Sequence, residues 1–189
     1  DTIDISNKAG AQTVDVALGT VTGGFLGGFS NIESFTGAAP DILQGTGVFS
    51  MTALNAGSAN GVSFTGFQNL SGSSGADTLD ISAIAGGNTV DFDAGTASGV
   101  ISGTFTGMEA FTGDNVADTL QGSGAFNITG GNDGTAAGNT FTNFFNLAGN
   151  AGNDTFTFAN AGSMGGTVSG GGGTDTLVGD ADGNAFTVN

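Results

Sequence analysis

Residues Asp1–Gly37 read DTIDISNKAGAQTVDVALGTVTGGFLGGFSNIESFTG, and Asp77–Gly113 read DTLDISAIAGGNTVDFDAGTASGVISGTFTGMEAFTG. The two stretches align without a gap, and 19 of the 37 positions are identical. After a one-residue slip the match resumes, so that Pro40–Thr52 (PDILQGTGVFSMT) matches Ala117–Thr129 (ADTLQGSGAFNIT). The chain is therefore about two and a half copies of one block of 76–77 residues. A long fixed period predicts a stacked repeat protein, which offers length and surface rather than an enclosed pocket.

No shift in composition interrupts this repetition. We expect a single continuous domain over residues 1–189, made of blocks 1–76 and 77–153 and a partial block 154–189. The chain begins inside one repeat motif (DTIDIS) and stops inside another (NAFTVN), so we expect it to be a segment of something longer.

Short runs of alternating apolar and polar residues lie between the glycines. Such period-2 alternation predicts strands with one buried face, and each run lasts about four residues before Gly, Asn or Asp allows a turn. Helical periodicity is absent, and frequent Gly disfavours helices. The runs are TVDV at Thr13–Val16, TVDF at Thr89–Phe92, FNIT at Phe126–Thr129, TFTF at Thr155–Phe158 and FTV at Phe186–Val188.

These strands predict an all-β fold, a parallel β-solenoid (β-helix or β-roll) in which successive coils stack at about 4.8 Å. Dividing each block at its Gly-flanked strands predicts about ten coils of 18–21 residues, roughly four per block. Apolar residues that recur between blocks define the predicted core. These pairs are Val14/Val90, Phe35/Phe111, Leu43/Leu120, Phe49/Phe126, Met51/Ile128, Phe64/Phe141, Phe67/Phe144, Leu70/Leu147, Leu79/Phe156 and Ile81/Phe158.

The composition excludes several classes of function. The chain has 17 acidic residues and one basic residue, Lys8, for a formal net charge of −16. Nucleic acids and anionic membrane surfaces bind through Lys and Arg, so neither is an expected partner. There is no Cys for a disulfide framework and no apolar run long enough for a transmembrane helix, so we expect no membrane insertion.

Aspartates at the end of glycine-rich turns form the most specific motif. Gly170–Val178 reads GGGGTDTLV and fits the nonapeptide G-G-x-G-x-D-x-U-x, in which U is a large apolar residue. Gly149–Thr157 (GNAGNDTFT) and Gly72–Asp80 (GSSGADTLD) fit it except at the second glycine. In these motifs the chain resembles the RTX (repeat-in-toxin) β-roll proteins, and it looks like the S-layer proteins and large adhesins of bacterial surfaces that carry such nonapeptides.

The resemblance implies calcium as a cofactor, bound by motif aspartates and neighbouring turn carbonyls. Calcium takes six to eight oxygen ligands, which two stacked turns together supply. Only the C-terminal end approaches tandem spacing, since Gly179–Thr187 (GDADGNAFT) follows the GGGGTDTLV motif directly. The candidate metal ligands implied are Asp154, Asp175, Asp180 and Asp182. The alternative is that these aspartates stabilise turns by accepting hydrogen bonds from local backbone N–H groups.

We do not expect an enzyme. The pairs Asp77/Asp80 and Asp91/Asp93 offer paired carboxylates, as glycoside hydrolysis requires. However, the chain has no His, Arg, Tyr or Cys and one Lys, so it lacks most general bases and cations that steady a developing anion. Asp91 and Asp93 alternate with Phe92, so we expect both on the solvent face of one strand.

The expected function is structural, as an extracellular repeat segment of a bacterial surface fibre, S-layer or adhesin. Exposed strand edges at a solenoid's ends pair readily, so the expected partners are flanking repeats or further copies assembled head-to-tail, with contact to a cell surface or glycan. Two alternatives remain: a calcium-binding RTX-like secretion or binding module, and a fragment of a polysaccharide-active β-helix enzyme.

Overall fold

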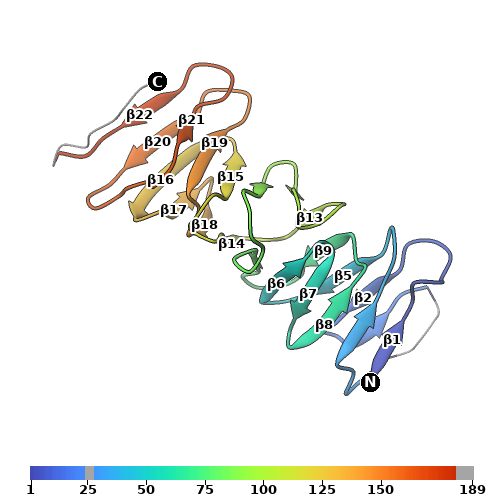
Figure 1. The fold of residues 1–189 in the computed structure, drawn as a ribbon. Coiled ribbons are helices and arrows are strands. Elements are labelled where there is room, and N and C mark those ends of the chain that lie inside the picture. Colours follow the sequence, from blue (N-terminus) through green and yellow to red (C-terminus); the bar gives the residue numbers. More distant parts are fainter. Residues whose placement is uncertain (24–27, 182–189) are drawn as a thin grey trace.

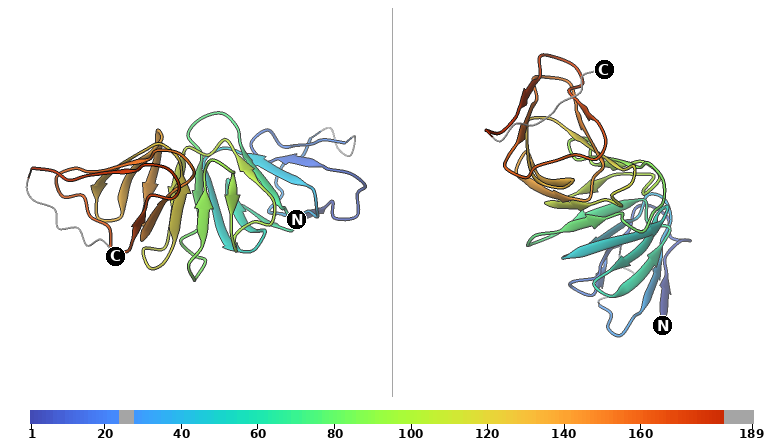
Figure 2. Two further views of the ribbon diagram at one scale, coloured as in Figure 1. Left: turned by 90° about the horizontal axis from the view of Figure 1, so that it is seen from above. Right: turned by 60° about the vertical axis from the view of Figure 1, so that its left-hand side comes forward.

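The computed structural model describes residues 1–23 and 28–181. The described chain forms an elongated, all-β rod without helices, with the first strand near one end and the last near the other (Figure 1). The predicted parallel β-solenoid is confirmed. Successive rungs of the winding chain lie over one another along the rod, as the two views in Figure 2 show.

One sheet of twelve strands runs the length of the rod. Its strands run in the order β1-β4-β8-β7-β6-β10-β14-β18-β17-β16-β20-β22, so the spatial order departs twice from the chain order. The strands are β1 (Thr2–Asp4), β4 (Ser34–Thr36), β6 (Val48–Ala53), β7 (Ala56–Ala59), β8 (Val62–Thr65), β10 (Thr78–Asp80), β14 (Ala110–Thr112), β16 (Ala125–Gly130), β17 (Asp133–Ala136), β18 (Asn139–Thr142), β20 (Thr155–Phe158) and β22 (Thr176–Val178).

Two sheets of five strands complete the solenoid, one in each half of the rod. In the first half the order is β13-β9-β5-β2-β3, and in the second half it is β12-β11-β15-β19-β21. The first sheet contains β2 (Thr13–Asp15), β3 (Thr20–Val21), β5 (Ile42–Gly45), β9 (Asn69–Gly72) and β13 (Phe105–Thr106). The second contains β11 (Thr89–Asp91), β12 (Thr96–Ala97), β15 (Thr119–Gly122), β19 (Asn146–Gly149) and β21 (Val168–Ser169).

The predicted coil length is wrong. The solenoid has about five turns rather than ten. Before the last described rung, residues stacked on adjacent rungs lie 27 to 35 residues apart. Thr112 and Thr142, whose hydroxyls are 3.2 Å apart, are one such pair, with a separation of 30 residues. Only the last described rung has the predicted length, since Asp154 and its partner Asp175 are 21 residues apart.

The prediction of a purely parallel winding missed antiparallel meanders and the short antiparallel pairs β2–β3 and β11–β12, which lengthen the rungs. Strands β6, β7 and β8 form one meander, and β16, β17 and β18 form its counterpart in the second block. Asn60 and Gly61 connect β7 to β8 with φ angles of 52° and 76°. Two residues with positive φ are the signature of a type I′ hairpin turn, and Asn-Gly is its preferred sequence.

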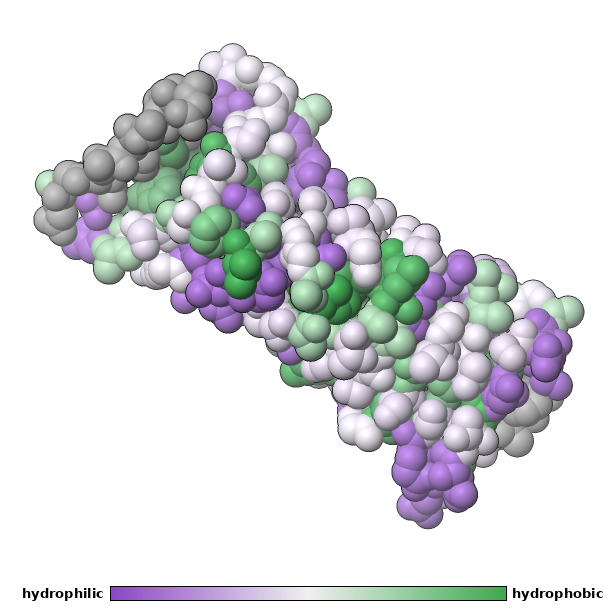
Figure 3. Space-filling model, in the orientation of Figure 1, coloured by the Kyte–Doolittle hydropathy of each residue, from purple (hydrophilic) through white to green (hydrophobic). Residues whose placement is uncertain are grey.

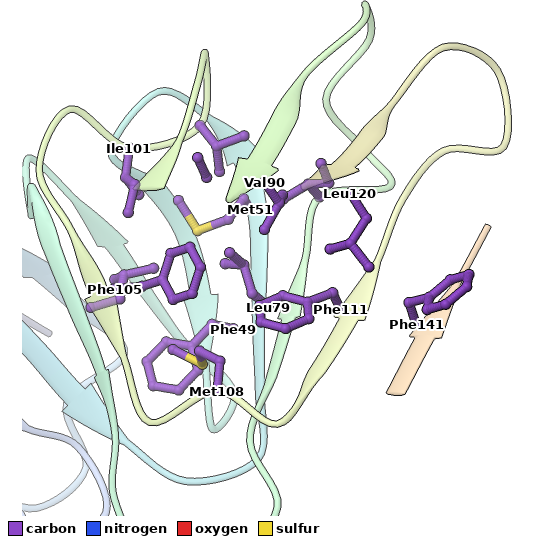
Figure 4. Packing of buried hydrophobic residues seen from close by; sticks show 14 of the residues in the cluster. Phe49, Met51, Leu79, Val90, Ile101, Phe105, Met108, Phe111, Leu120 and Phe141 are labelled. Carbon is purple, nitrogen blue, oxygen red and sulfur yellow. The ribbon is translucent and has the colours of Figure 1, made fainter. Parts of the chain in front are cut away.

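The core is the predicted one. All twenty residues of the recurring apolar pairs are buried, and the largest fully buried side chains are mostly Phe. Phe49, Leu79, Phe111 and Phe141 come from adjacent strands β6, β10, β14 and β18 and lie in one row inside the rod (Figure 4). Each buried aromatic or aliphatic side chain contributes about 1.5–3 kcal/mol, which offsets the entropy cost of a glycine-rich chain.

Candidate functional site

Four buried aspartates lie at corners of the solenoid, two before strands of the five-stranded sheets and two before strands of the twelve-stranded sheet. Asp41, Asp77, Asp118 and Asp154 are each no more than 2% exposed. Each immediately precedes a strand: β5, β10, β15 and β20 respectively. A buried carboxylate requires hydrogen-bond partners, because an unpaired polar group in the interior costs free energy. Two of the four corners meet that requirement at both carboxylate oxygens, and the other two at one oxygen only.

At Asp41 and Asp118 the carboxylate is fully hydrogen-bonded. Asp41 Oδ1 accepts from the backbone N–H of Gln12 on the preceding rung and Oδ2 from that of Ala38, each at 2.9 Å. Asp118 repeats this arrangement, since Oδ1 accepts from Asn88 N at 2.9 Å and Oδ2 from Asp114 N at 3.0 Å. Each of these two carboxylates therefore hydrogen-bonds to the preceding rung through Oδ1 and to a backbone N–H of its own turn through Oδ2.

At Asp77 and Asp154 one carboxylate oxygen has no donor. Asp77 Oδ1 accepts from Gly47 N at 2.5 Å, and Asp154 Oδ1 accepts from Gly124 N at 2.5 Å. The second oxygen, Oδ2, is buried in both residues and has no hydrogen-bond partner among the described residues. The two positions are equivalent in successive blocks and are the aspartates of the two imperfect nonapeptides, so the motif builds a corner with one open oxygen.

The open oxygen faces a backbone carbonyl across a glycine. A Cβ built on Gly72 would collide with both Asp77 Oδ2 and the Gly107 carbonyl oxygen, and one on Gly149 with both Asp154 Oδ2 and the Gly170 carbonyl oxygen. Glycine is therefore required at both places because two oxygens approach the same Cα. A buried, unpartnered carboxylate oxygen near a backbone carbonyl oxygen is complementary to a positively charged or hydrogen-donating group, such as a cation, a water molecule or an amide N–H.

The N–H of the same aspartates is bound by an acidic residue on the next rung. Asp77 N donates to Glu109 Oε2 and Asp154 N to Asp175 Oδ1, each at 2.9 Å. In the first block the amino group of Asp1 pairs with Glu33 Oε2. Sequence reasoning missed Glu33 and Glu109, although both occupy the same position of the aligned stretches (IESFTG and MEAFTG).

Of the four predicted calcium ligands, the structure brings two together. Asp154 is buried and hydrogen-bonded through its N–H to half-buried Asp175, while Asp180 is half-buried beyond β22. Asp182 lies outside the described residues. In residues 1–23 and 28–181 no three acidic side chains cluster closely enough to suggest a metal centre by themselves. Turn carbonyls, such as that of Gly170, would have to complete a calcium site at Asp154.

Burial raises the pKa of Asp118 above its usual value of 3.8, and a like charge on Asp114 acts in the same direction. The hydrogen bonds from Asn88 and Asp114 oppose that shift but do not cancel it. Asp118 therefore binds a proton more tightly in the folded chain than in the unfolded one.

Of the carboxylate pair Asp91 and Asp93, Asp91 lines an open cleft of about 290 Å³ beside β11, β12 and the segment 101–103. Thr89, Asp91, Ser98 and Gln121 are among its mainly polar lining residues. Asp93 is exposed, and its Oδ2 accepts from Asn150 Nδ2 at 3.0 Å. The lining offers hydroxyl, carboxylate and amide groups that bind polar molecules, but neither His, Lys nor Arg.

Comparisons with protein-family models, with curated proteins and with solved structures each found no match to this chain. Within the described residues, no helix has the length and apolar character needed to cross a membrane.

Proposed function

We propose that this chain is a structural repeat segment of a bacterial extracellular surface fibre, S-layer or adhesin, where it provides length and a rigid spacing. The observation that carries the proposal is the continuous solenoid, in which every rung is stacked on its neighbours through sheet hydrogen bonds and one unbroken apolar core. Such a rod adds reach in proportion to its number of repeats.

The surface of the rod supports this proposal. The view in Figure 3 shows pale and hydrophilic residues with small separate apolar patches rather than one broad apolar face. Large apolar residues that are exposed, such as Leu18, Leu54 and Val116, come from different parts of the chain. A strongly acidic, cysteine-free rod is suited to remain soluble and well separated from other proteins outside the cell.

Immunogold electron microscopy of intact source cells tests the proposal. Antibodies raised against the folded chain should label filaments or a layer outside the cell envelope, and a fraction of surface proteins should contain the antigen. Labelling confined to the cytoplasm would refute it. Antibodies against the unfolded chain serve as the control for access.

A calcium-binding module is the second candidate function, and the open oxygen of Asp154 favours it. This buried carboxylate oxygen lies beside the Gly170 carbonyl and next to Asp175, where a hard cation would find oxygen ligands. Calorimetry of the chain in calcium and in excess chelator tests it. Calcium should raise the melting temperature of the wild-type chain and leave that of Asp154→Asn unchanged; identical wild-type melting curves would exclude a structural calcium ion.

A further inference from the structure

The first strand of the rod has an open edge that its counterpart in the next block does not have. Strand β10 pairs with β14 on one side and with β6 on the other. The equivalent strand β1 pairs with β4 in the same register, and no other described strand covers its second edge. Consequently Ile3 is only half-buried, whereas its counterpart Leu79 is fully buried.

The same is true on the neighbouring face of the first rung. Phe105 of β13 pairs with Leu70 of β9 in the preceding block and is 4% exposed. Its counterpart Phe29 is half-buried and belongs to no described strand. Phe29 nevertheless holds the equivalent position, because its N–H donates to Gly19 O at 2.7 Å as that of Phe105 does to Gly95 O.

The internal junctions show what covers such an edge. At β10, Gly47 N donates to the Asp77 carboxylate and Thr78 N donates to Gly47 O at 2.9 Å. At β20, Gly124 makes the same two contacts with Asp154 and Thr155. These glycines have φ angles of 85° and 102°, which lets one residue present both its N–H and its carbonyl to the edge. At the open edge the corresponding carboxylate, that of Asp1, is exposed.

We propose that the edge formed by β1 and by Phe29 and Ser30 is a docking surface for another block of this same repeat, which covers it with its second half. The docked half-block has the pattern of residues 41–72. A strand of the β6 type (G-x-G-x followed by apolar-x-apolar) pairs in parallel with β1, and a strand of the β9 type (Asn-Leu) pairs with Phe29. The glycine before the β6-type strand donates its N–H to Asp1 and accepts from Thr2 N. This inference rests on the proposed role as a repeat segment and names its partner.

The last described strand, β22, does not have the pairing of a β6-type strand. The terminal strand β22 pairs with β20 in the register in which β14 pairs with β10, so β22 is a β14-type strand. Inside the rod, β14-type strands pair onward with β18-type strands rather than with β10-type strands. Strand β22 is therefore not the β6-type strand that the edge of β1 requires.

A chain extended by one block tests the proposal. A copy of residues 1–76 is placed directly before Asp1, which reproduces the native junction between Ala76 and Asp77. Hydrogen exchange of the Thr2 amide is then compared between the extended and the original chain. Covering the edge should slow this exchange by at least about a hundredfold, because the amide becomes hydrogen-bonded inside a sheet. The control extension carries Gly47→Val and Phe49→Asp in the copied block only and should leave the exchange fast.

A second extension, with a copy of residues 77–153 in front of Asp1, guards against a failure specific to one added block. If circular dichroism shows either added block folded while the Thr2 amide still exchanges as fast as before, the proposal is overturned. It is equally overturned if neither added block folds, because the edge then does not accept a repeat. Surface labelling of cells is independent of both results, so failure of the proposed function is recognised separately.

Discussion

Replacing the corner aspartates by asparagine should have opposite effects at the open and the closed corners. In Asp77→Asn the amide oxygen keeps the hydrogen bond from Gly47 N, and the amide NH₂ takes the place of the unpartnered Oδ2. That NH₂ lies beside the Gly107 carbonyl and can donate to it. One new buried hydrogen bond is worth about 1 kcal/mol, so Asp77→Asn should stabilise the chain by about that amount.

At Asp118 the same change should destabilise the chain. Both carboxylate oxygens accept backbone N–H groups there, from Asn88 and from Asp114. An asparagine has one acceptor oxygen, so its NH₂ must face one of those N–H groups and leaves it unsatisfied. The expected loss is about 1–3 kcal/mol. The change of sign depends only on the hydrogen bonds of the second oxygen, since both sites are equally buried.

Urea denaturation followed by circular dichroism measures both effects, with Asp154→Asn and Asp41→Asn as the matched second pair. In chelator, Asp77→Asn and Asp154→Asn should shift the midpoint upward, and Asp118→Asn and Asp41→Asn should shift it downward. A shift of the same sign at all four positions would refute the assignment of open and closed corners. Repeating the series in calcium shows whether a cation occupies the open oxygens, since Asp154→Asn would then lose the stabilisation that the wild-type chain gains.

Three further predictions concern the core, the glycine contacts and pH. Phe126→Ala should lower the free energy of unfolding by about 3–5 kcal/mol in urea denaturation, because the ring is fully buried and stacks on Phe156 with ring centroids 4.6 Å apart. Leu54 is exposed, so Leu54→Ala should change the free energy of unfolding by less than about 0.5 kcal/mol. Gly149→Ala should lower the melting temperature strongly, because its Cβ would meet Asp154 and the Gly170 carbonyl. Gly172→Ala should be tolerated, because the heavy atom nearest to its Cβ would be 3.9 Å away. Equal effects of the two variants on the melting temperature would contradict the close approach at Gly149. The folded-state pKa of Asp118 lies above 3.8, so the contribution of Asp118 to stability should rise as pH falls through that pKa. Carbon NMR of the Asp118 carboxyl should give a titration midpoint above 3.8. A lower titration midpoint would contradict the burial argument.

The fold class and the core could be predicted because they depend on periodicity. The repeated Phe, Leu and Val positions are the ones that strands of neighbouring rungs bury, and the alternation with Thr or Asp fixed which face they point to. The coil length could not be obtained by dividing a block at its glycines, because β6, β7 and β8 reverse direction within one rung. The dipeptide Asn60-Gly61 carries the signal for that reversal, but in the second block Ala137-Gly138 occupies the same turn and hides it.

Asp77 and Asp154 are recognisable from their nonapeptides, but the sequence does not show their burial or how they differ from Asp41 and Asp118. Asp77 and Asp118 look alike in sequence, since both begin a DTL triplet. The difference arises from Asp114, whose N–H closes the Asp118 corner, and from Gly72, which leaves the Asp77 oxygen facing a carbonyl. Contacts of this kind join residues of different rungs, so they follow from the winding and not from a local motif.

Disulfide formation between engineered cysteines tests the 30-residue winding most directly. Thr112 and Thr142 are register partners on β14 and β18, and the chain contains no other cysteine. Neighbouring strand positions lie within the distance that a disulfide spans. The Thr112→Cys, Thr142→Cys double variant should oxidise readily and stay folded. The matched pair Thr112→Cys, Asp133→Cys, with residues two strands apart, should remain reduced. Rapid oxidation of the second pair and not the first would show that the rungs are shorter and that this account of the rod is incorrect.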